Sequence, residues 1–114
     1  MTKIGIIGTG MLGNAVGLHL LKSGFDLTVY NRTKEKTNEL KNNGAKVVDS
    51  PKNVAKNSEL IIIVVKDADV VKEVSFGENG IIGGKHKGLT VADMSTINPV
   101  ESKKISKKFL EHEI

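Results

Sequence analysis

The segment IGIIGTGMLGNAVG (residues 4–17) carries three glycines in the spacing Gly8-x-Gly10-x-x-Gly13, between an apolar run and a helical pattern. In this spacing, Gly8 permits a tight turn, Gly10 lets the backbone approach a ligand, and Gly13 lets the helix pack close to the strand. The N–H groups that open the following helix attract an anion such as a pyrophosphate. The loop therefore predicts a dinucleotide site, and the alternative is a strand–helix turn without a ligand. The expected contacts are Gly8, Thr9, Gly10, Met11, Leu12 and Gly13.

Short β-branched runs alternate with amphipathic segments along the whole chain. We expect strands at 3–8, 26–30, 45–49, 60–65 and 89–94, and helices at 11–24, 33–44, 50–57, 67–76 and 98–113. This alternation is typical of βαβ units around a parallel sheet. We predict one α/β domain over residues 1–114, a Rossmann-type doubly wound sheet with helices on both faces. Because such a sheet has strand order 3-2-1-4-5-6, we expect the chain to be truncated before the sixth strand.

Local signals refine these elements. The helix at 11–24 should bury an apolar face made of Leu12, Ala15, Val16 and Leu20. Glycines are expected to end two helices, at Gly24 and Gly44, and polar residues to begin two others, at Ser50 and Asp67. The uniformly apolar run at 60–65 predicts a strand that is buried on both faces. Gly5 and Gly17 lie outside the glycine triplet, and we expect them to serve close packing.

Composition excludes several classes of site. There is no cysteine, and His19, His86 and His112 lack the spacing of metal ligands. The sequence has no run of about 18 apolar residues, which argues against a membrane span. Without a secretory signal pattern at the N-terminus, we expect a cytoplasmic protein. The net charge of +4 is compatible with nucleic acid, but aromatic residues make up only 4%, so we do not expect nucleic acid as a partner.

The segment VYNRT (residues 29–33) follows the second expected strand, where dinucleotide folds read the adenosine ribose. An acidic residue would favour NAD(H) there, but this chain has Asn31, Arg32 and Thr33. Arg32, the sole arginine, can grip a 2′-phosphate or stack on adenine, and its neighbours add uncharged hydrogen bonds. We therefore expect NADP(H) to be preferred, with NAD(H) possible. The alternative is a solvent-exposed cation after a strand.

The segment VADMSTINP (residues 91–99) places Ser95 and Thr96 just beyond the fifth expected strand. Ligands of open α/β sheets bind outside the carboxyl ends of the strands. Taken alone, a serine and a threonine before a proline-led helix also fit a cap and turn.

The order of GIIGTGMLG, VYNRT, SPKNVAKNSELIIIVV, ENGIIGG and DMSTINP resembles the β-hydroxyacid dehydrogenase family over essentially the whole chain. That family includes 3-hydroxyisobutyrate dehydrogenases and glyoxylate and succinic semialdehyde reductases. The resemblance implies hydride transfer between nicotinamide and a small carboxylate substrate. It implies that Asp93 belongs to the substrate–nicotinamide junction, that Ser95 binds the substrate carboxylate and that Thr96 lies near the nicotinamide ribose. Val64, Val65 and Lys66 would pass the ribose and adenine side of the cofactor.

The resemblance also implies what these residues lack. Family members are more than twice this long and continue into a sixth strand and a mostly helical domain. That domain supplies the catalytic lysine and the dimer contacts, so we expect the lysine beyond Ile114 and a homo-oligomer for the full-length protein. Lys66, Lys85 and Lys87 do not match the catalytic motif. The chain alone is expected to bind cofactor without turnover.

DMST argues against 6-phosphogluconate dehydrogenases and, less firmly, against imine reductases, which also share NRT. Two alternatives stay open. One is an imine-reducing enzyme, and the other is a nucleotide- or DNA-binding module without catalysis, favoured by the basic repeat of Lys103, Lys104, Lys107 and Lys108. The same repeat fits a solvated helix face opposite Val100, Ile105 and Phe109.

Overall fold

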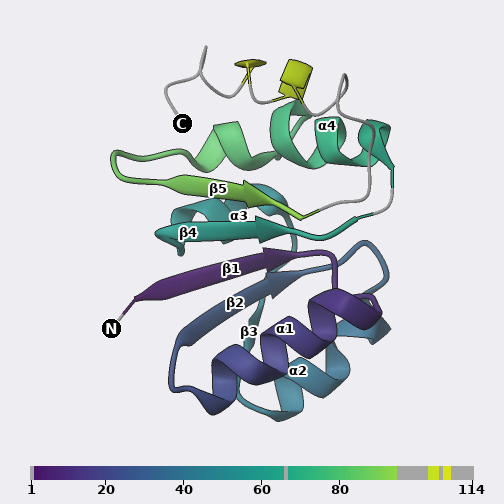
Figure 1. Cartoon of the computed structure of the whole chain (residues 1–114), viewed down its shortest axis with the longest axis vertical. Helices are drawn as coiled ribbons and strands as arrows, with labels where there is room; N and C mark the ends of the chain where they lie inside the picture. The colour runs from purple at the N-terminus through teal and green to yellow at the C-terminus, as the bar shows by residue number, and fades with distance from the viewer. Residues whose placement is uncertain (1, 66, 95–102, 106, 109–114) are drawn as a thin grey trace.

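A five-stranded parallel sheet forms the centre of the molecule (Figure 1). The computed structural model describes residues 2–65, 67–94, 103–105, 107 and 108. Within these residues the strands are β1 (Lys3–Ile7), β2 (Asp26–Tyr30), β3 (Lys46–Val47), β4 (Leu60–Ile63) and β5 (Thr90–Asp93). Their spatial order is β3-β2-β1-β4-β5, and every neighbouring pair is parallel. The predicted doubly wound fold is confirmed for these strands.

Helices cover both faces of this sheet. The α-helices are α1 (Met11–Lys22), α2 (Asn38–Asn42), α3 (Pro51–Lys56) and α4 (Ala68–Phe76), and two 3-10 turns are η1 (Lys34–Thr37) and η2 (Ile81–Gly84). Figure 1 shows α1 and α2 in front of the sheet, α3 behind it, and α4 beside β5 at the top. Each crossover thus returns the chain to the same end of the sheet, which gathers the loops after the strands at one edge.

Alternate residues of the central strands enter two separate hydrophobic cores. In β1, Ile4 and Ile6 join the cluster under α1 and α2, whereas Ile7 joins the cluster under α3 and α4. In β4, Ile61 and Ile63 are fully buried in the second cluster. Ile62 is only half-buried against the first. The prediction that this strand is buried on both faces is therefore correct for one face and overstated for the other.

The predicted helix ends are confirmed. After α1, Gly24 adopts φ +90°, and the N–H groups of Gly24 and Phe25 donate to the carbonyls of Leu21 and Leu20, at 3.0 and 3.1 Å. This is a Schellman ending, and it needs a residue that tolerates positive φ. α2 ends in the same way before Gly44. At the starts of α3 and α4, Ser50 Oγ accepts from Asn53 N–H, and Asp67 Oδ1 accepts from Asp69 N–H.

The buried face of α1 differs from the predicted one. Leu12 is 51% exposed and Ala15 is exposed as well, whereas Gly13 and Gly17 are buried. Val16 and Leu20 are half-buried against the core, as the pattern indicated. The helix turns its two glycines to the sheet because they permit a closer approach than leucine would. The prediction for Leu12 and Ala15 was wrong, and both side chains are left for the surface of the site.

One predicted helix is interrupted in the structure, and another is described only in part. The segment 33–44 is not one helix but the turn η1 followed by the short α2, with Thr37 buried at the junction. Most of the predicted helix 98–113 lies outside the described residues. In its described part, Ile105 is buried in the core and the four lysines of the basic repeat are exposed, which fits both a solvated face and a basic binding surface. Lys108 Nζ lies 4.7 Å from the ring centre of Phe76 in α4.

Gly5 in β1 is held in a tight contact between the sheet and α3. A Cβ added there would overlap Val54 Cγ1 and lie 2.5 Å from Ser58 Oγ. Gly17 in α1 is similarly tight, because a Cβ would lie 2.7 Å from Leu40 Cδ2. The expectation that these two glycines serve close packing is confirmed.

We predict that Gly5→Ala destabilises the fold by about 1–3 kcal/mol, because the branched, fully buried Val54 cannot move aside. Urea unfolding followed by circular dichroism measures the change in the free energy of unfolding. Gly10→Ala is the matched control, since a Cβ there meets no described atom within 4 Å. Equal stabilities of the two variants would contradict this account of the packing.

His86 joins the end of α3 to the loop that precedes β5. Its Nε2 lies 2.7 Å from the Ser58 carbonyl and 3.1 Å from that of Ala55, while Nδ1 lies 3.1 Å from the Lys87 carbonyl. Carbonyl oxygens only accept, so both sides of the ring can form these hydrogen bonds together only when both nitrogens carry a proton. The Lys87 bond, followed by the Ser58 bond, raises the pKa of His86 above its ordinary 6.5. The protonated imidazole thus stabilises the fold.

A raised pKa in the folded state gives a defined pH dependence. The stabilisation is complete below the unfolded pKa and is lost as pH rises through the raised folded pKa. We predict that His86→Gln loses more stability relative to wild type at about pH 5.5 than at about pH 8.5. Urea unfolding of both proteins at both pH values tests this. A difference that grows toward high pH would rule out the protonated form as the stabilising one.

Candidate functional site

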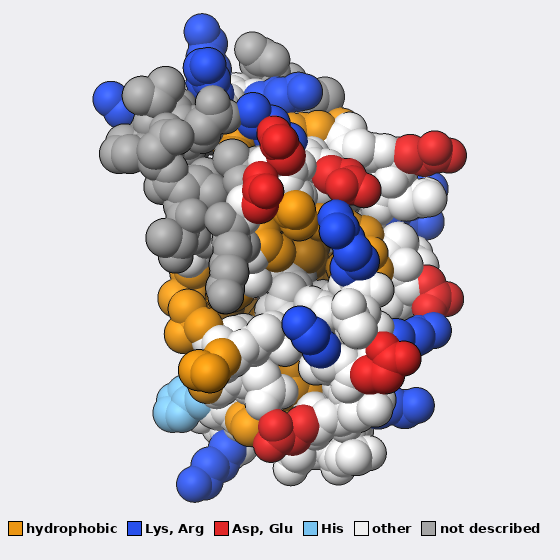
Figure 2. All heavy atoms as spheres, turned by 90° about the vertical axis from the view of Figure 1, so that its right-hand side faces the viewer, with side chains coloured by type: hydrophobic (Ala, Val, Ile, Leu, Met, Phe, Trp, Pro, Cys, Tyr) orange, Lys and Arg blue, Asp and Glu red, His pale blue; other side chains and the backbone are white. Residues whose placement is uncertain are grey.

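The site lies at the carboxyl edge of the sheet, where the chain direction across the sheet reverses. From β1 the chain proceeds to β2 and β3 on one side, and then to β4 and β5 on the other. The crevice between the ends of β1 and β4 is the switch point at which open α/β sheets bind ligands. Figure 2 faces this edge and shows a hollow with hydrophobic side chains inside it and both basic and acidic side chains around it.

Gly8 and Gly13 shape the loop that enters the crevice from β1. Gly8 has φ +100°, and a Cβ there would overlap the Val64 carbonyl oxygen beyond β4. A Cβ on Gly13 would overlap the Gly8 carbonyl oxygen. Both obstacles are backbone atoms and cannot rotate away. The first and third glycines of the triplet are therefore required by the turn and by the helix contact, in agreement with the sequence prediction.

Gly10 has a different environment. It is exposed, and an added Cβ would meet no atom of the described residues within 4 Å. The absent side chain leaves the backbone open to a ligand, in the place where a pyrophosphate approaches such loops. Packing within the described residues therefore does not require a glycine at position 10, and its exposed backbone is accessible to a ligand.

The N-terminus of α1 opens beside Gly10. The N–H groups of a first helical turn have no partner within the helix. No side chain of the described residues caps this end, and its first turn holds no acidic residue. The N-terminus therefore presents uncompensated donors and a positive dipole end, a suitable environment for phosphate.

A broad groove of about 690 Å³ runs in front of this helix start. Its walls are mainly apolar: Gly10, Met11, Leu12, Gly13, Ala15, Lys36, Val64, Val65 and Met94. Met11, Leu12 and Met94 are the large hydrophobic residues that the described part of the chain exposes, at 94%, 51% and 48%. The apolar residues of α1 that do not pack into the core, Met11, Leu12 and Ala15, therefore line the groove.

Asn31 holds the glycine loop in position. Its Oδ1 accepts a hydrogen bond from the Thr9 N–H at 3.0 Å, and its Nδ2 donates to the Thr33 carbonyl at 2.9 Å. The buried Thr9 hydroxyl donates to the Lys36 carbonyl at 2.8 Å. Three predicted site residues, Thr9, Asn31 and Thr33, therefore form one network that joins the loop to the end of β2. Direct contact of Asn31 or Thr33 with a cofactor stays a prediction.

Arg32 borders a narrow cleft of about 70 Å³ beside the loop. The cleft is lined by Ile7, Gly8, Tyr30, Asn31, Arg32, Val65, Val70, Glu73 and Val74. Arg32 Nη2 lies 3.6 Å from Glu73 Oε2, and the two side chains are 73% and 71% exposed. Its apolar walls offer a surface for one side of a flat ring such as adenine, and Arg32 adds a cation at the rim for an attached anion.

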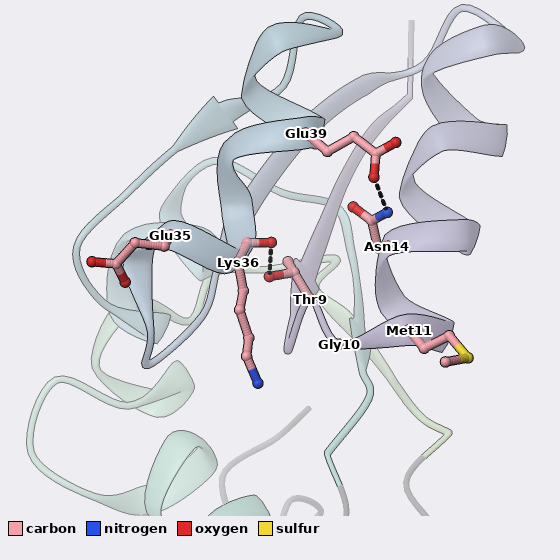
Figure 3. A pocket seen from close by; sticks show the side chains of 7 residues that line it. All are labelled: Thr9, Gly10, Met11, Asn14, Glu35, Lys36 and Glu39. Carbon is pink, nitrogen blue, oxygen red and sulfur yellow. Dashed lines mark hydrogen bonds between the residues drawn. The ribbon is translucent and has the colours of Figure 1, made fainter.

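A third depression of about 400 Å³ lies on the other side of the loop, between α1 and the turn η1 (Figure 3). Asn14 Nδ2 donates to Glu39 Oε1 at 2.7 Å, so these side chains point toward each other across it. Lys36 lines both this depression and the broad groove. Figure 3 shows Glu35 pointing away from the other labelled side chains. Lys36 thus adds a positive charge near the glycine loop.

Sequence reasoning missed the contributions of α4 and of Lys36. Val70, Glu73 and Val74 form the far wall of the cleft, although no motif distinguishes them. Their spacing in the helix was the available signal, since it puts them on one face. Lys36 stood among many other lysines and carried no signal of its own.

The predicted residues around β4 and β5 are only partly described. Val64 and Val65 line the broad groove, and their contact with the cofactor stays a prediction. Asp93 ends β5, and Met94 follows it with its N–H donating to the Ile63 carbonyl at 2.8 Å. Lys66, Ser95 and Thr96 lie outside the described residues. Their cofactor and substrate roles stay predictions.

The sheet order, the glycine loop and the open helix start together define a dinucleotide-binding domain of the doubly wound class. The family model described as the NAD binding domain of 6-phosphogluconate dehydrogenase matches residues 3–114. The chain belongs to this family. The predicted nucleotide-binding function is confirmed. The argument against 6-phosphogluconate dehydrogenase activity rests on the residues after β5 and stays a prediction.

Named relatives support the resemblance to hydroxyacid dehydrogenases. The chain is 34% identical over 110 residues to the "Probable 3-hydroxyisobutyrate dehydrogenase, mitochondrial" of Dictyostelium discoideum, covering 96% of this chain and 34% of that protein. It is 36% identical over 105 residues to the 3-sulfolactaldehyde reductase of Escherichia coli, covering 92% and 35%. The chain therefore spans about a third of the length of these relatives.

Solved structures show the same fold. The imine reductase from Myxococcus stipitatus in complex with NADP⁺ superposes with a TM-score of 0.89 at 26% identity, covering 98% of this chain and 38% of that one. Where the structure describes the chain, none of its helices combines the length and apolar character that a membrane span requires.

We predict that Asn31→Ala weakens NADP(H) and NAD(H) binding by similar factors, because it releases the loop that both dinucleotides need. Loss of its hydrogen bonds should also lower the free energy of unfolding by about 1–2 kcal/mol. Calorimetric titration with each cofactor and urea unfolding measure the two effects. A loss confined to one cofactor would instead indicate that Asn31 reads the adenosine directly.

Proposed function

We propose that the chain is the NADP(H)-binding domain of an oxidoreductase that transfers a hydride between nicotinamide and a small β-hydroxyacid or its carbonyl form. The observation that carries the cofactor preference is the position of Arg32. Its guanidinium stands at the rim of the apolar cleft beside the glycine loop, where an acidic residue would favour NAD(H). NAD(H) can still bind, because the loop and the cleft contact parts that both cofactors share.

The residues present fit the cofactor. The open backbone at Gly10 and the free start of α1 would hold the pyrophosphate. The cleft formed by Tyr30, Val65 and Val70 would receive the adenine, and Arg32 the 2′-phosphate. When bound, the nicotinamide supplies the hydride chemistry, while the protein supplies binding and orientation. The apolar side chains of Met11 and Leu12, which line the broad groove, would shield one side of the bound dinucleotide from water.

The remaining parts of the proposed site come from the resemblance to hydroxyacid dehydrogenases. We propose that Ser95 binds the substrate carboxylate and that Thr96 contacts the nicotinamide ribose, with Lys66 beside the adenosine. The proton would be moved by a lysine of a further helical domain, a general acid–base role. The chain alone would then bind cofactor without turnover. In support, relatives about three times as long include a dehydrogenase and a reductase of small carbonyl compounds.

Reduction of imines is a second candidate, favoured by the similarity to the NADP⁺ complex of an imine reductase. The two candidates share the cofactor domain and differ in substrate. Activity assays of a full-length protein with β-hydroxyacids and with cyclic imines distinguish them. A nucleic-acid-binding module has less support, because aromatic residues, on which bases stack, make up only 4% of the chain.

We also propose that the full-length protein is a cytoplasmic homo-oligomer whose subunit contacts are made by the helical domain. Because one relative is named as a mitochondrial protein, the mitochondrion is the second compartment in which the full-length protein should be sought.

We predict that wild type binds NADPH more tightly than NADH and that Arg32→Ala abolishes the difference. Loss of the charge-assisted contact to the 2′-phosphate costs about 1.5–3 kcal/mol, which is about 10- to 100-fold in affinity. NADH binding should change little. Calorimetric titration of both cofactors measures the four affinities.

Lys34→Ala is the matched control. It removes one exposed positive charge two residues away, and Lys34 Nζ is already paired with Asp49 Oδ1 at 3.0 Å. This variant should keep the preference for NADPH. Equal affinities of wild type for the two cofactors, or an equal loss in both variants, would refute the assignment of the 2′-phosphate to Arg32.

A further inference from the structure

The ion pair between Arg32 and Glu73 joins opposite walls of the narrow cleft. Arg32 follows β2, whereas Glu73 lies within α4, and their closest charged atoms are 3.6 Å apart. Both residues line the cleft. The cation proposed for the 2′-phosphate thus already has an anionic partner in the protein.

The pair is poorly placed to serve folding. Both side chains are more than two-thirds exposed, and an exposed ion pair contributes little to stability because water and salt screen it. The walls are held in place by other contacts: Val71 of α4 is fully buried in the core, and Asp67 caps the helix start. Glu73 is therefore not needed to hold the walls together, and its carboxylate lies at the cleft where a ligand would bind.

A carboxylate and a phosphate compete for the same guanidinium. The fork of Arg32 can bind a phosphate through two parallel hydrogen bonds, but only when those donors are turned toward it. An arginine held toward Glu73 must first give up that pairing. A ligand with only a 2′-hydroxyl makes no such demand on Arg32, so the acid affects the two cofactors unequally.

We propose that Glu73 is a specificity-determining residue of the cofactor site, one that weakens recognition of a 2′-phosphate by competing for Arg32. The inference rests on the proposed function of Arg32 and deepens it. Arg32 creates the preference for the phosphorylated adenosine, and Glu73 limits how large that preference is. A domain with this pair therefore prefers the phosphorylated cofactor by a smaller factor than Arg32 alone would give.

The test uses adenosine 2′,5′-bisphosphate and adenosine 5′-monophosphate as probes, which differ only in the 2′-phosphate. Their affinities are measured by calorimetry at low ionic strength, where surface charges act most strongly. Four proteins form a double-mutant cycle: wild type, Glu73→Gln, Arg32→Ala and the double variant. Glu78→Gln is the matched control, because it removes the same charge from an exposed position just beyond α4 that does not line the cleft.

We expect Glu73→Gln to bind the bisphosphate about two- to fivefold more tightly, the range of an exposed ion pair. Its affinity for the monophosphate should not change. In the Arg32→Ala background the same substitution should have no effect, because the group being contested is gone. Glu78→Gln should bind both probes as wild type does. Circular dichroism confirms that each variant is folded.

The outcomes separate this inference from the proposed function. If wild type prefers the bisphosphate but Glu73→Gln leaves its affinity unchanged, competition by Glu73 is overturned and the role of Arg32 stands. A gain that persists without Arg32, or that Glu78→Gln reproduces, shows general charge repulsion and also overturns it. If wild type does not distinguish the probes and Arg32→Ala has no effect, the proposed function of Arg32 fails, and the inference fails with it.

Discussion

Backbone contact at the glycine loop is the constraint on which the rest of the site depends. Gly8, Gly13 and the carbonyl of Val64 meet where even one added methyl group would overlap a backbone oxygen. This approach fixes the start of α1 against the ends of β1 and β4, and it places the open helix terminus at the switch point of the sheet. The network from Asn31 to Thr9 then sets the loop relative to β2. The positions of the broad groove and the narrow cleft follow from these two attachments.

Much of this architecture can be predicted from the sequence because it is local. Strand identity follows from short β-branched runs, helix ends from Gly24, Gly44 and Ser50, and the turn from the spacing of the triplet. The errors occurred where tertiary packing overrides a local pattern. Leu12 fits a helical apolar face, yet α1 turns Gly13 and Gly17 to the sheet, where an added Cβ would overlap the Gly8 carbonyl oxygen or lie 2.7 Å from Leu40 Cδ2. The polar segment at 33–44 formed a 3-10 turn and a short helix, since Thr37 is buried at the junction.

The candidate site shows the same division. Its half from β1 and β2 belongs to recognisable motifs, because phosphate binding demands particular backbone geometry and donors. The half from α4 could not be read from the sequence: Val70 and Glu73 are ordinary helix residues, and only the parallel crossover brings them opposite Arg32. A charge contact between distant segments leaves no local pattern. For that reason Arg32 could be proposed from the sequence as a phosphate-binding residue, whereas its ion pair with Glu73 could not be predicted.

The adjacent residues Asn31 and Arg32 divide two tasks between them. The amide of Asn31 is engaged with the loop, whereas the charged end of Arg32 extends into solvent and, among the described contacts, meets Glu73. Exchange of the residue at position 32 therefore leaves the attachment of the loop intact. In evolutionary terms, cofactor preference in such a domain can drift by single substitutions without an intermediate that loses the fold. A designer who wishes to reverse the preference should alter position 32 and its partner on α4, and retain the asparagine beside it.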